Sequence, residues 1–319
     1  MAHFEIIKCH GSGNDFIMVD CVAQPIYESV DWEAFARVAC NRECGIGSDG
    51  LLLLVRTSGG GYAMDMLNPD GTHAEMCGNG IRCVARLAML RGYIEQCGAL
   101  WSGGRDYAVA RAGFVAEGIE AYSVAITINT HSDDFAFFGR GERFVAGELP
   151  TLCDAMRFTA LNLGNPHIVA RVEGIDLGLL EHLGQSVISR KELFPRGVNV
   201  SLYERRAPRK LFVATYERGA GITLSCGTAM TASATAAALL GEVDAGERIE
   251  VSNRGGRVFC TTEITAEGIT TRLEGNATFE WWGRASFDGV SLGYELLTPT
   301  GEAELWQNFV DSINENNAR

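Results

Sequence analysis

The chain has 319 residues, of which 46% are hydrophobic and 21% are charged, and its formal net charge is −13. This length exceeds the roughly 100–200 residues of a single domain, so we expect two domains with sizeable cores. The acidic balance disfavours a nucleic-acid surface, which needs clustered Lys and Arg. The longest apolar run, 51–55, is far short of the roughly 20 residues of a membrane helix, and the first residues lack an apolar signal segment. We therefore expect a cytoplasmic protein without a nucleic-acid or membrane partner.

The chain contains ten cysteines and no CxxC pair. In a large chain without a signal segment, this usage is more typical of free thiols than of a disulfide framework. Structural zinc sites use close cysteine pairs, so we expect no metal.

The first part of the chain predicts alternating strands and helices. Strands are expected at 4–9 and 16–20 around the loop HGSGNDF, a helix at 31–44, and strands at 51–56 and 62–67. Short strands are expected between residues 92 and 128.

Cys77 lies in the stretch NPDGTHAEMCGNGIRCVARLAML, residues 68–90. The Gly-Asn-Gly turn after it leads into apolar residues at helical spacing, so we expect a helix N-terminus whose backbone N–H groups are free to bind an anion. A helix N-terminus can lower a thiol pKa from about 8.5 to roughly 3.5–7.5. Cys77 is therefore predicted to be a base or a nucleophile near neutral pH.

The second part of the chain repeats this order. A strand at 158–163 leads into GNPHIVARV, a short helix is expected at 179–183, and strands at 198–203 and 210–216 lead into ERGAGITLSCGTAMTASATAAALLG. From Thr300 onward we expect a terminal helix that packs on the first domain, with an oligomer contact as the alternative.

The repeat keeps its spacing. Asn14 precedes Cys77 by 63 residues, and Asn165 precedes Cys226 by 61. A polar residue stands nine positions before each cysteine, namely Asn68 and Glu217. We infer two homologous halves, one at 1–126, completed by 287–319, and the other at 127–286.

Two related halves would place Cys77 and Cys226 on opposite walls of one cleft, each at a helix N-terminus. A single base returns its proton to the face from which it was removed, whereas two bases on opposite faces allow inversion at a carbon. The pattern therefore predicts a racemase or epimerase.

The motifs HGSGNDF, NPDGTHAEMCGNGIRC, LGNPH, GVNVS, YERGAG and SCGT together resemble diaminopimelate epimerase across residues 3–285. This family interconverts L,L- and meso-diaminopimelate without pyridoxal phosphate or another cofactor. The resemblance implies an α/β (α+β) fold of two domains, each a curled, mostly antiparallel sheet around a central helix, with the active site in the interdomain cleft. It also implies a role in lysine and peptidoglycan precursor biosynthesis, an amino-acid substrate as partner, and a homodimer as one candidate assembly.

By this resemblance Cys77 and Cys226 form the acid/base pair. The residues implied to hold the substrate are Asn14, Asn68, Asn165, Asn199, Glu217 and Arg218, together with the turn residues Gly78, Asn79, Gly227 and Thr228. Arg218 would pair with the distal carboxylate, and His167 would support the site. A turn histidine and a turn-capping asparagine are the structural alternatives for His167 and Asn14.

Three positions depart from the residues usual in the family, namely Gly50, Ile222 and Ala229. Two other functions stay open. The first is a racemase of another amino acid, such as histidine, although a substrate without a distal carboxylate would leave Arg218 unpaired. The second is a carboxylate-binding protein without catalysis, which the presence of both cysteines disfavours.

Overall fold

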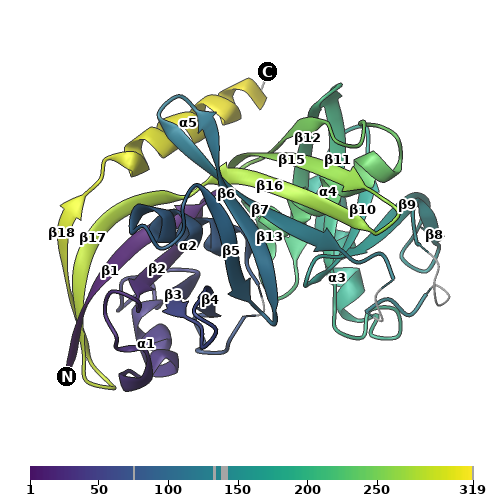
Figure 1. Cartoon of the computed structure of the whole chain (residues 1–319). Coiled ribbons are helices and arrows are strands. Elements are labelled where there is room, and N and C mark those ends of the chain that lie inside the picture. Colours follow the sequence, from purple (N-terminus) through teal and green to yellow (C-terminus); the bar gives the residue numbers. More distant parts are fainter. Residues whose placement is uncertain (75, 132–133, 138–142, 318–319) are drawn as a thin grey trace. The chain divides into compact units, whose positions relative to one another are not determined.

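The structure, a computed structural model, describes the chain except residues 75, 132–133, 138–142 and 318–319. Contacts between residues divide the chain into two units. Figure 1 colours the chain by residue number, so each unit can be found from its residue range. The first unit comprises Met1–Val124 and Glu274–Arg319, and the second comprises Ala125–Leu273. Among the described residues, no helix is both long enough and apolar enough to cross a membrane.

The first unit is a largely antiparallel sheet with a helix inside it. Its elements are β1 (Ala2–Gly11), β2 (Asn14–Asp20), η1 (Tyr27–Ser29), α1 (Trp32–Ala39), β3 (Gly50–Arg56), β4 (Tyr62–Leu67), α2 (Gly78–Leu90), β5 (Cys97–Ser102), β6 (Arg105–Ala116), β7 (Ile119–Ile128), β17 (Thr278–Phe287), β18 (Leu292–Pro299) and α5 (Glu302–Asn317). Strand β7 continues past Val124 into the second unit. The strands follow the order β18–β17–β1–β2–β3–β4–β5–β6–β7.

The second unit is built in the same way. Its elements are β8 (Gly147–Leu149), β9 (Cys153–Asn162), β10 (Pro166–Arg171), α3 (Leu177–Ile188), β11 (Asn199–Ala207), β12 (Lys210–Glu217), β13 (Gly221–Thr223), α4 (Gly227–Leu239), β14 (Arg248–Asn253) and β15 (Gly256–Ile264), and β16 (Ile269–Asn276) leads back into the first unit. The order is β8–β9–β10–β11–β12–β14–β15, with β13 also on β12.

The pairing pattern confirms the internal repeat that the sequence predicts. From β1 to β6 the successive pairs are antiparallel, parallel, antiparallel, parallel and antiparallel. From β9 to β15, leaving out β13, they follow the same series. A parallel pair needs a crossover connection, and in both units a helix provides it: α1 and α2 in the first, α3 and α4 in the second.

The second crossover helix of each unit is the central one. Helix α2 contacts β1, β2, β3, β4 and β6, and α4 contacts β10, β11, β12, β14 and β15. Helix α4 is buried from Gly227 to Ala238 and consists largely of Ala, Ser and Thr, whose small side chains let strands approach from all sides. Its buried hydroxyls bond back to the helix, as in the 2.8 Å bond from Thr231 to the carbonyl oxygen of Gly227.

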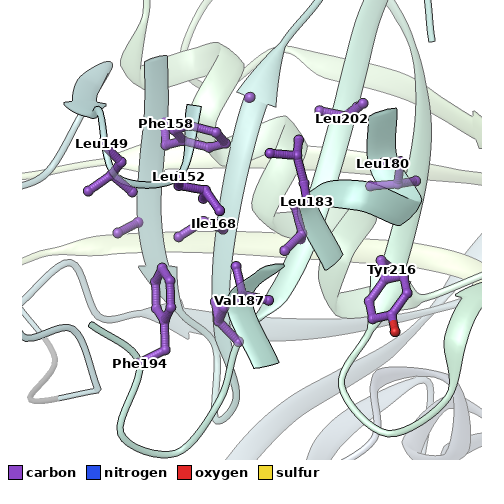
Figure 2. Close-up of a cluster of buried hydrophobic side chains, with 14 of the residues drawn as sticks. Leu149, Leu152, Phe158, Ile168, Leu180, Leu183, Val187, Phe194, Leu202 and Tyr216 are labelled. Carbon is purple, nitrogen blue, oxygen red and sulfur yellow. The ribbon is translucent and has the colours of Figure 1, made fainter. Parts of the chain in front are cut away.

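Helix α3 covers the outer face of the second sheet, and Figure 2 shows its apolar side chains against that face. Leu180, Leu183 and Val187 are buried there with Leu202 and Tyr216 of the neighbouring strands. The spacing of these leucines gives the helix one apolar side. It starts before the expected range 179–183 because Asp176 caps it, accepting bonds from two backbone N–H groups. It continues to Ile188 because Val187, one turn after Leu183, extends the apolar side.

Helix α1 is shorter than the expected 31–44, because the chain turns back on the helix end. The N–H groups of Ile46 and Gly47 both bond to the carbonyl oxygen of Ala39 at 2.9 Å. The Asn41 side chain accepts bonds from the next turn, including one of 3.1 Å from the N–H of Cys44. These bonds satisfy the last helical carbonyls and end the helix.

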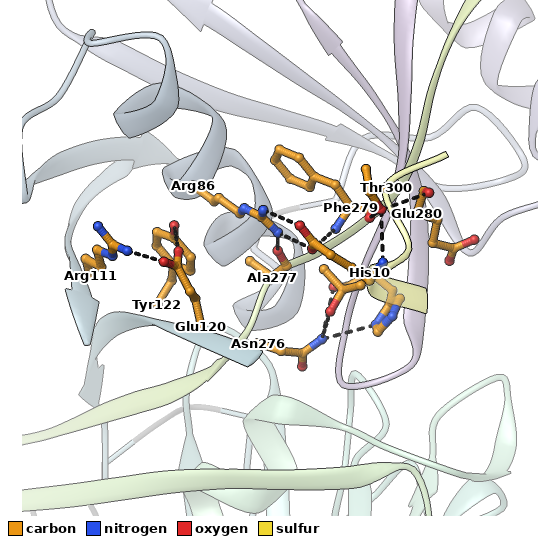
Figure 3. A network of polar contacts seen from close by, with 12 residues as sticks. His10, Arg86, Arg111, Glu120, Tyr122, Asn276, Ala277, Phe279, Glu280 and Thr300 are labelled. Atoms are coloured by element: carbon orange, nitrogen blue, oxygen red, sulfur yellow. Dashed lines mark hydrogen bonds and ion pairs between the residues drawn. The ribbon is translucent and has the colours of Figure 1, made fainter. Parts of the chain in front are cut away.

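The C-terminal segment packs on the first unit, in agreement with the main sequence interpretation. Strand β17 pairs with β1 from Ala2↔Phe287 to His10↔Thr278, which is why residues 274–286 group with the first unit although the sequence-based boundary follows residue 286. The first boundary lies at 124/125, against the expected 126/127. Trp306 of α5 is buried against the β6–β7 hairpin. Figure 3 shows the neighbouring polar groups, among them Arg86 beside Phe279.

Candidate active site

Cys77 is the N-cap residue of α2. Its backbone is extended, with φ −135° and ψ 115°, and its sulfur accepts a bond of 3.4 Å from the N–H of Gly80. The helix begins with Gly-Asn-Gly, whose first N–H groups have no partner within a helix. The thiol therefore lies at the positive end of the helix, beside backbone N–H groups that have no partner within the helix.

Asn14 is the nearest polar partner of this thiol. Its Oδ1 accepts a 3.6 Å bond from Cys77 Sγ and a 3.3 Å bond from Asn79 Nδ2. Its own Nδ2 donates to Asp49 at 2.7 Å, which fixes the direction of the amide. The structure thus brings Asn14, Cys77 and Asn79 together within the first unit.

Asn68 is engaged in its own turn. Its Nδ2 donates to Thr72 Oγ1 at 3.0 Å, and its backbone carbonyl accepts a 2.9 Å bond from Gly71. These bonds hold the Asn-Pro-Asp-Gly turn, and within the described residues the Asn68 side chain has no recorded bond to Cys77.

Burial raises the pKa of the Cys77 thiol above its ordinary value, while the N–H groups of Gly80 and Asn79 and the charge of Arg82 oppose that rise. The low pKa expected from the helix N-terminus alone is therefore wrong in direction. Desolvation of the thiolate outweighs the helix end and the positive charge.

Cys226 occupies the equivalent place in the second unit. It is the N-cap residue of α4, with φ −130° and ψ 110°, and only 7% of it is exposed. Its sulfur lies 3.5 Å from Thr228 Oγ1. Like α2, α4 opens with glycine and runs for 13 residues. The two cysteines thus share one backbone geometry at the start of a central helix.

Thr228 connects Cys226 to a buried polar group on the neighbouring strands. Its hydroxyl accepts a 3.3 Å bond from Asn165 Nδ2 and lies 3.1 Å from His167 Nε2. His167 Nε2 also lies 3.0 Å from Asn165 Oδ1. His167 pairs with Asn199 in the parallel register of β10 and β11, which brings Asn199 beside this group.

His167 is neutral in this setting. Burial, followed by the charge of Arg218, lowers its pKa to about 3. The Asn165 Oδ1 atom can only accept, so Nε2 of His167 is assigned the proton. The other nitrogen, Nδ1, is buried without a hydrogen-bond partner among the described residues. His167 therefore supports Thr228 and Asn165 rather than titrating near neutral pH.

Glu217 and Arg218 lie where β12 ends and the chain bends. Gly219 and Gly221 have φ of 84° and 76°, a left-handed conformation that glycine adopts without strain. Glu217 accepts a bond from Thr223, and Asn199 Oδ1 accepts a 2.9 Å bond from the N–H of Arg218. Adjacent residues of a strand point to opposite faces, so a shared pocket for Glu217 and Arg218 requires a bend, and the chain bends at these glycines.

Burial and the charge of Glu217 raise the pKa of Cys226 well above its ordinary value, and the Thr228 hydroxyl opposes the rise. The two thiols thus differ in their charged neighbours. Cys77 has a cation, Arg82, that favours the thiolate, whereas Cys226 has a carboxylate that favours the neutral thiol.

The three residues that depart from the family pattern have structural settings of their own. Ala229 is fully buried in α4, and Ile222 packs against the core beneath α3. At Gly50, a Cβ atom would lie 2.9 Å from the carbonyl oxygen of Leu67, so the adjoining strand leaves no room for a side chain.

Comparison with known proteins identifies the family. A model of diaminopimelate epimerase matches residues 6–105 and 159–280, which is more than half of the chain and includes both cysteines. The chain belongs to the diaminopimelate epimerase family. It is accordingly an isomerase.

Relatives match nearly the whole length of this family member. A diaminopimelate epimerase from Clostridium acetobutylicum is 35% identical and covers 90% of this chain and 87% of its own. One from Enterococcus faecalis is 34% identical and covers 97% and 98%. The alignment with the latter extends over nearly the whole chain, whereas the family model ends at residue 280.

Solved structures share the fold at low sequence identity. A probable proline racemase from Agrobacterium radiobacter has a TM-score of 0.61 at 15% identity and covers 89% of this chain and 93% of that chain. A hydroxyproline epimerase from Agrobacterium vitis has a TM-score of 0.60 at 15% identity and covers 93% and 92%. Both likenesses place the chain in the fold of these racemases and epimerases.

Proposed function

We propose that this family member converts L,L-diaminopimelate to meso-diaminopimelate without a cofactor, with Cys77 and Cys226 as its acid/base pair. The observation that carries the proposal is the equivalence of the two cysteines. Each is the N-cap of a 13-residue central helix, with φ and ψ values that agree within 5°. Family membership supplies the reaction and the substrate class.

In the proposed reaction one cysteine thiolate removes the proton from the α-carbon of the substrate. The electron pair left on that carbon delocalises into the adjacent carboxylate, whose growing negative charge the helix N-termini would stabilise through the N–H groups of Gly78, Asn79, Gly227 and Thr228. The other cysteine thiol then gives its proton to the opposite face of the carbon. The product has the inverted configuration, and the two sulfurs have exchanged protonation states.

The surroundings of the two thiols support a division of roles. Arg82 favours a thiolate at Cys77, and Glu217 favours a neutral thiol at Cys226. We assign Cys77 as the thiol that loses its proton more readily and acts as the base, and Cys226 as the acid. Two thiols in identical surroundings would have no such preference.

The proposed substrate contacts follow the expected residues. Arg218 is exposed at the bend after β12 and would pair with the distal carboxylate of the substrate. Asn14, Asn68, Asn165, Asn199 and Glu217 would hold its polar groups, with His167 orienting Asn165 and Thr228. We place this reaction in the cytoplasm, in the formation of lysine and peptidoglycan precursors, with a homodimer as a candidate assembly.

The test is incubation of the purified protein with L,L-diaminopimelate in deuterated water, followed by chiral separation and mass spectrometry. We expect α-deuterium in the inverted product. Exchange with another amino acid, such as histidine, in place of diaminopimelate would contradict the proposed substrate. No exchange with any amino acid would contradict catalysis altogether.

A further inference from the structure

Arg82 is fully buried in α2, five residues after Cys77, and in the reaction proposed above it enters only through its charge, with no contact to the substrate. A buried arginine costs much free energy unless its donors are paired, so its partners indicate why it is there. We propose that Arg82 is the positioning residue of the Cys77 half-site: it holds the loop that carries Asn14 against the first turn of α2, and it places a permanent positive charge on that turn, next to the N-cap Cys77. This inference deepens the function proposed for Cys77 and rests on it.

The guanidinium of Arg82 spans three segments of the chain. It donates to the carbonyl oxygen of Asn276 at 3.2 Å, to the carbonyl oxygen of Gly78 at 2.9 Å, to Asn79 Oδ1 at 3.1 Å and to Ser12 Oγ at 3.2 Å. Two of these acceptors belong to the first turn of α2, one to the loop between β1 and β2, and one to the end of β16. The planar fork of arginine can reach all of them at once.

The loop that Arg82 holds is strained and close to the helix. Ser12 has φ 55°, a left-handed conformation that costs a residue with a side chain about 1 kcal/mol or more. Its N–H donates to Asn276 Oδ1 at 2.7 Å, so Asn276 and Arg82 fix both its backbone and its hydroxyl. At Gly11, a Cβ atom would lie 2.8 Å from the carbonyl oxygen of Asn79. The loop thus lies directly on the start of α2.

This placement reaches the thiol through Asn14, which follows Ser12 by two residues. Asn14 Oδ1 accepts bonds from both Cys77 Sγ and Asn79 Nδ2. Asn79 in turn accepts a bond from Arg82 through its own Oδ1. A change at Arg82 would therefore release Asn79 and Ser12 together, and with them the orientation of Asn14 toward Cys77.

The charge of Arg82 acts on the same group. A guanidinium stays protonated at all accessible pH values, and a nearby cation favours the thiolate over the thiol. Its charge opposes the effect of burial on Cys77, as described above. Lysine would keep the charge, but its single ammonium could not hold acceptors from three segments.

Arg86 provides a matched control. It lies one turn further along α2, about 6 Å further from Cys77 by the helix rise, and it faces the same segment through a 2.6 Å bond to the carbonyl oxygen of Ala277. Its charge is paired with Glu302. Removing it takes one positive charge from the same helix without changing the group beside Cys77.

The experiment compares Arg82→Met, Arg82→Lys and Arg86→Met, each in a Cys226→Ala background. The rate of Cys77 alkylation by iodoacetamide is measured against pH, with the Cys77 peptide followed by mass spectrometry because other thiols are exposed. The reference is the Cys226→Ala protein with Arg82 and Arg86 intact. Relative to it, we expect the pH midpoint of alkylation to rise by about one pH unit in Arg82→Met and to stay unchanged in Arg82→Lys and Arg86→Met. An unchanged midpoint in Arg82→Met, or an equal shift in Arg86→Met, would overturn the proposal.

The lysine variant tests the positioning role separately and covers the case in which Arg82→Met does not fold. With Cys226 intact, Arg82→Lys should lower kcat/KM for epimerisation at least about tenfold, because one ammonium cannot replace the fork. Wild-type turnover in Arg82→Lys would contradict that role. If the wild-type protein itself does not epimerise diaminopimelate, the proposed function fails, while the alkylation midpoints still decide the effect of Arg82 on Cys77.

Discussion

Arg86 and Glu302 form a two-point ion pair that joins the cysteine-bearing helix α2 to the terminal helix α5. Each guanidinium nitrogen lies 2.6 Å from a different carboxylate oxygen. Glu302 also accepts a 3.0 Å bond from the N–H of Phe279, and the guanidinium lies over the Phe279 ring, 4.2 Å from its centre (Figure 3). The tail beyond the part matched by the family model is therefore tied to the helix that positions Cys77.

Replacing Glu302 with Gln should lower the free energy of unfolding by about 2 kcal/mol, because Arg86 would keep a partly buried charge without its carboxylate. Urea unfolding at neutral pH measures this loss. The control is Glu304→Gln, which removes an exposed carboxylate from the same first turn of α5 and should change stability by less than about 0.5 kcal/mol. Equal losses in the two variants would show that the effect comes from the helix dipole or the net charge rather than from the pair.

Gly197 tests the role of Arg218. A Cβ atom at Gly197 would lie 2.6 Å from Arg218 Cδ, so Gly197→Ala should displace the arginine side chain. If Arg218 holds the distal carboxylate, kcat/KM for diaminopimelate should fall at least about tenfold, since a charge-assisted pair would be lost. Steady-state kinetics with the purified variant measures the change.

The matched control for that variant is Gly241→Ala. Gly241 has φ 69°, close to the 74° of Gly197, but a Cβ atom there would have no neighbour within 4 Å. Both substitutions should cost about 1 kcal/mol of stability through backbone strain. Only Gly197→Ala should impair turnover, and a similar impairment in both would remove the support for Arg218.

The acid sensitivity of folding should depend on His167. Burial lowers the pKa of this histidine from 6.5 to about 3, so between these pH values the unfolded chain binds a proton that the folded protein does not. The free energy of unfolding therefore falls as pH decreases through this window. Urea unfolding measures the free energy of unfolding at about pH 7 and at about pH 4.5. The decrease between these pH values should be smaller by about 2 kcal/mol in His167→Gln than in the wild type.

Other buried groups contribute to the same acid loss, notably His10, whose pKa burial lowers to about 4. The comparison therefore uses the exposed His3 as a control, and His3→Gln should show the wild-type dependence on pH. If His167→Gln and His3→Gln both follow the wild-type curve, His167 does not stay neutral in the folded protein.

The sequence predicts the internal repeat well because equivalent residues recur at nearly the same distances along the chain. Asn14 and Asn165 stand at nearly equal distances before Cys77 and Cys226, and the strand pairing follows the same series in both units. The element types around the cysteines are predicted correctly, since glycine turns and apolar periodicity are local signals. The end of α1 at Ala39 is not, because the bonds that end it come from a loop that folds back on the helix.

Other features depend on tertiary burial and could not be read from spacing. The direction of the Cys77 pKa shift follows from desolvation, which a helix-terminus argument leaves out. The sequence does not point to Arg82 as a positioning residue, because its acceptors come from segments nearly 200 residues apart in the chain. One signal was present in the sequence, since a charged residue directly after Ile81 and before Cys83 interrupts a largely apolar stretch of the helix.

The central claim is that both cysteines carry protons in one reaction, and single replacements test it most directly. Cys77→Ala and Cys226→Ala are each incubated with L,L-diaminopimelate in deuterated water, and inversion is followed by chiral separation, with circular dichroism as the check on folding. The account predicts that each variant folds and loses inversion by at least about 1,000-fold. Inversion at more than about one tenth of the wild-type rate in either folded variant would contradict a two-base mechanism.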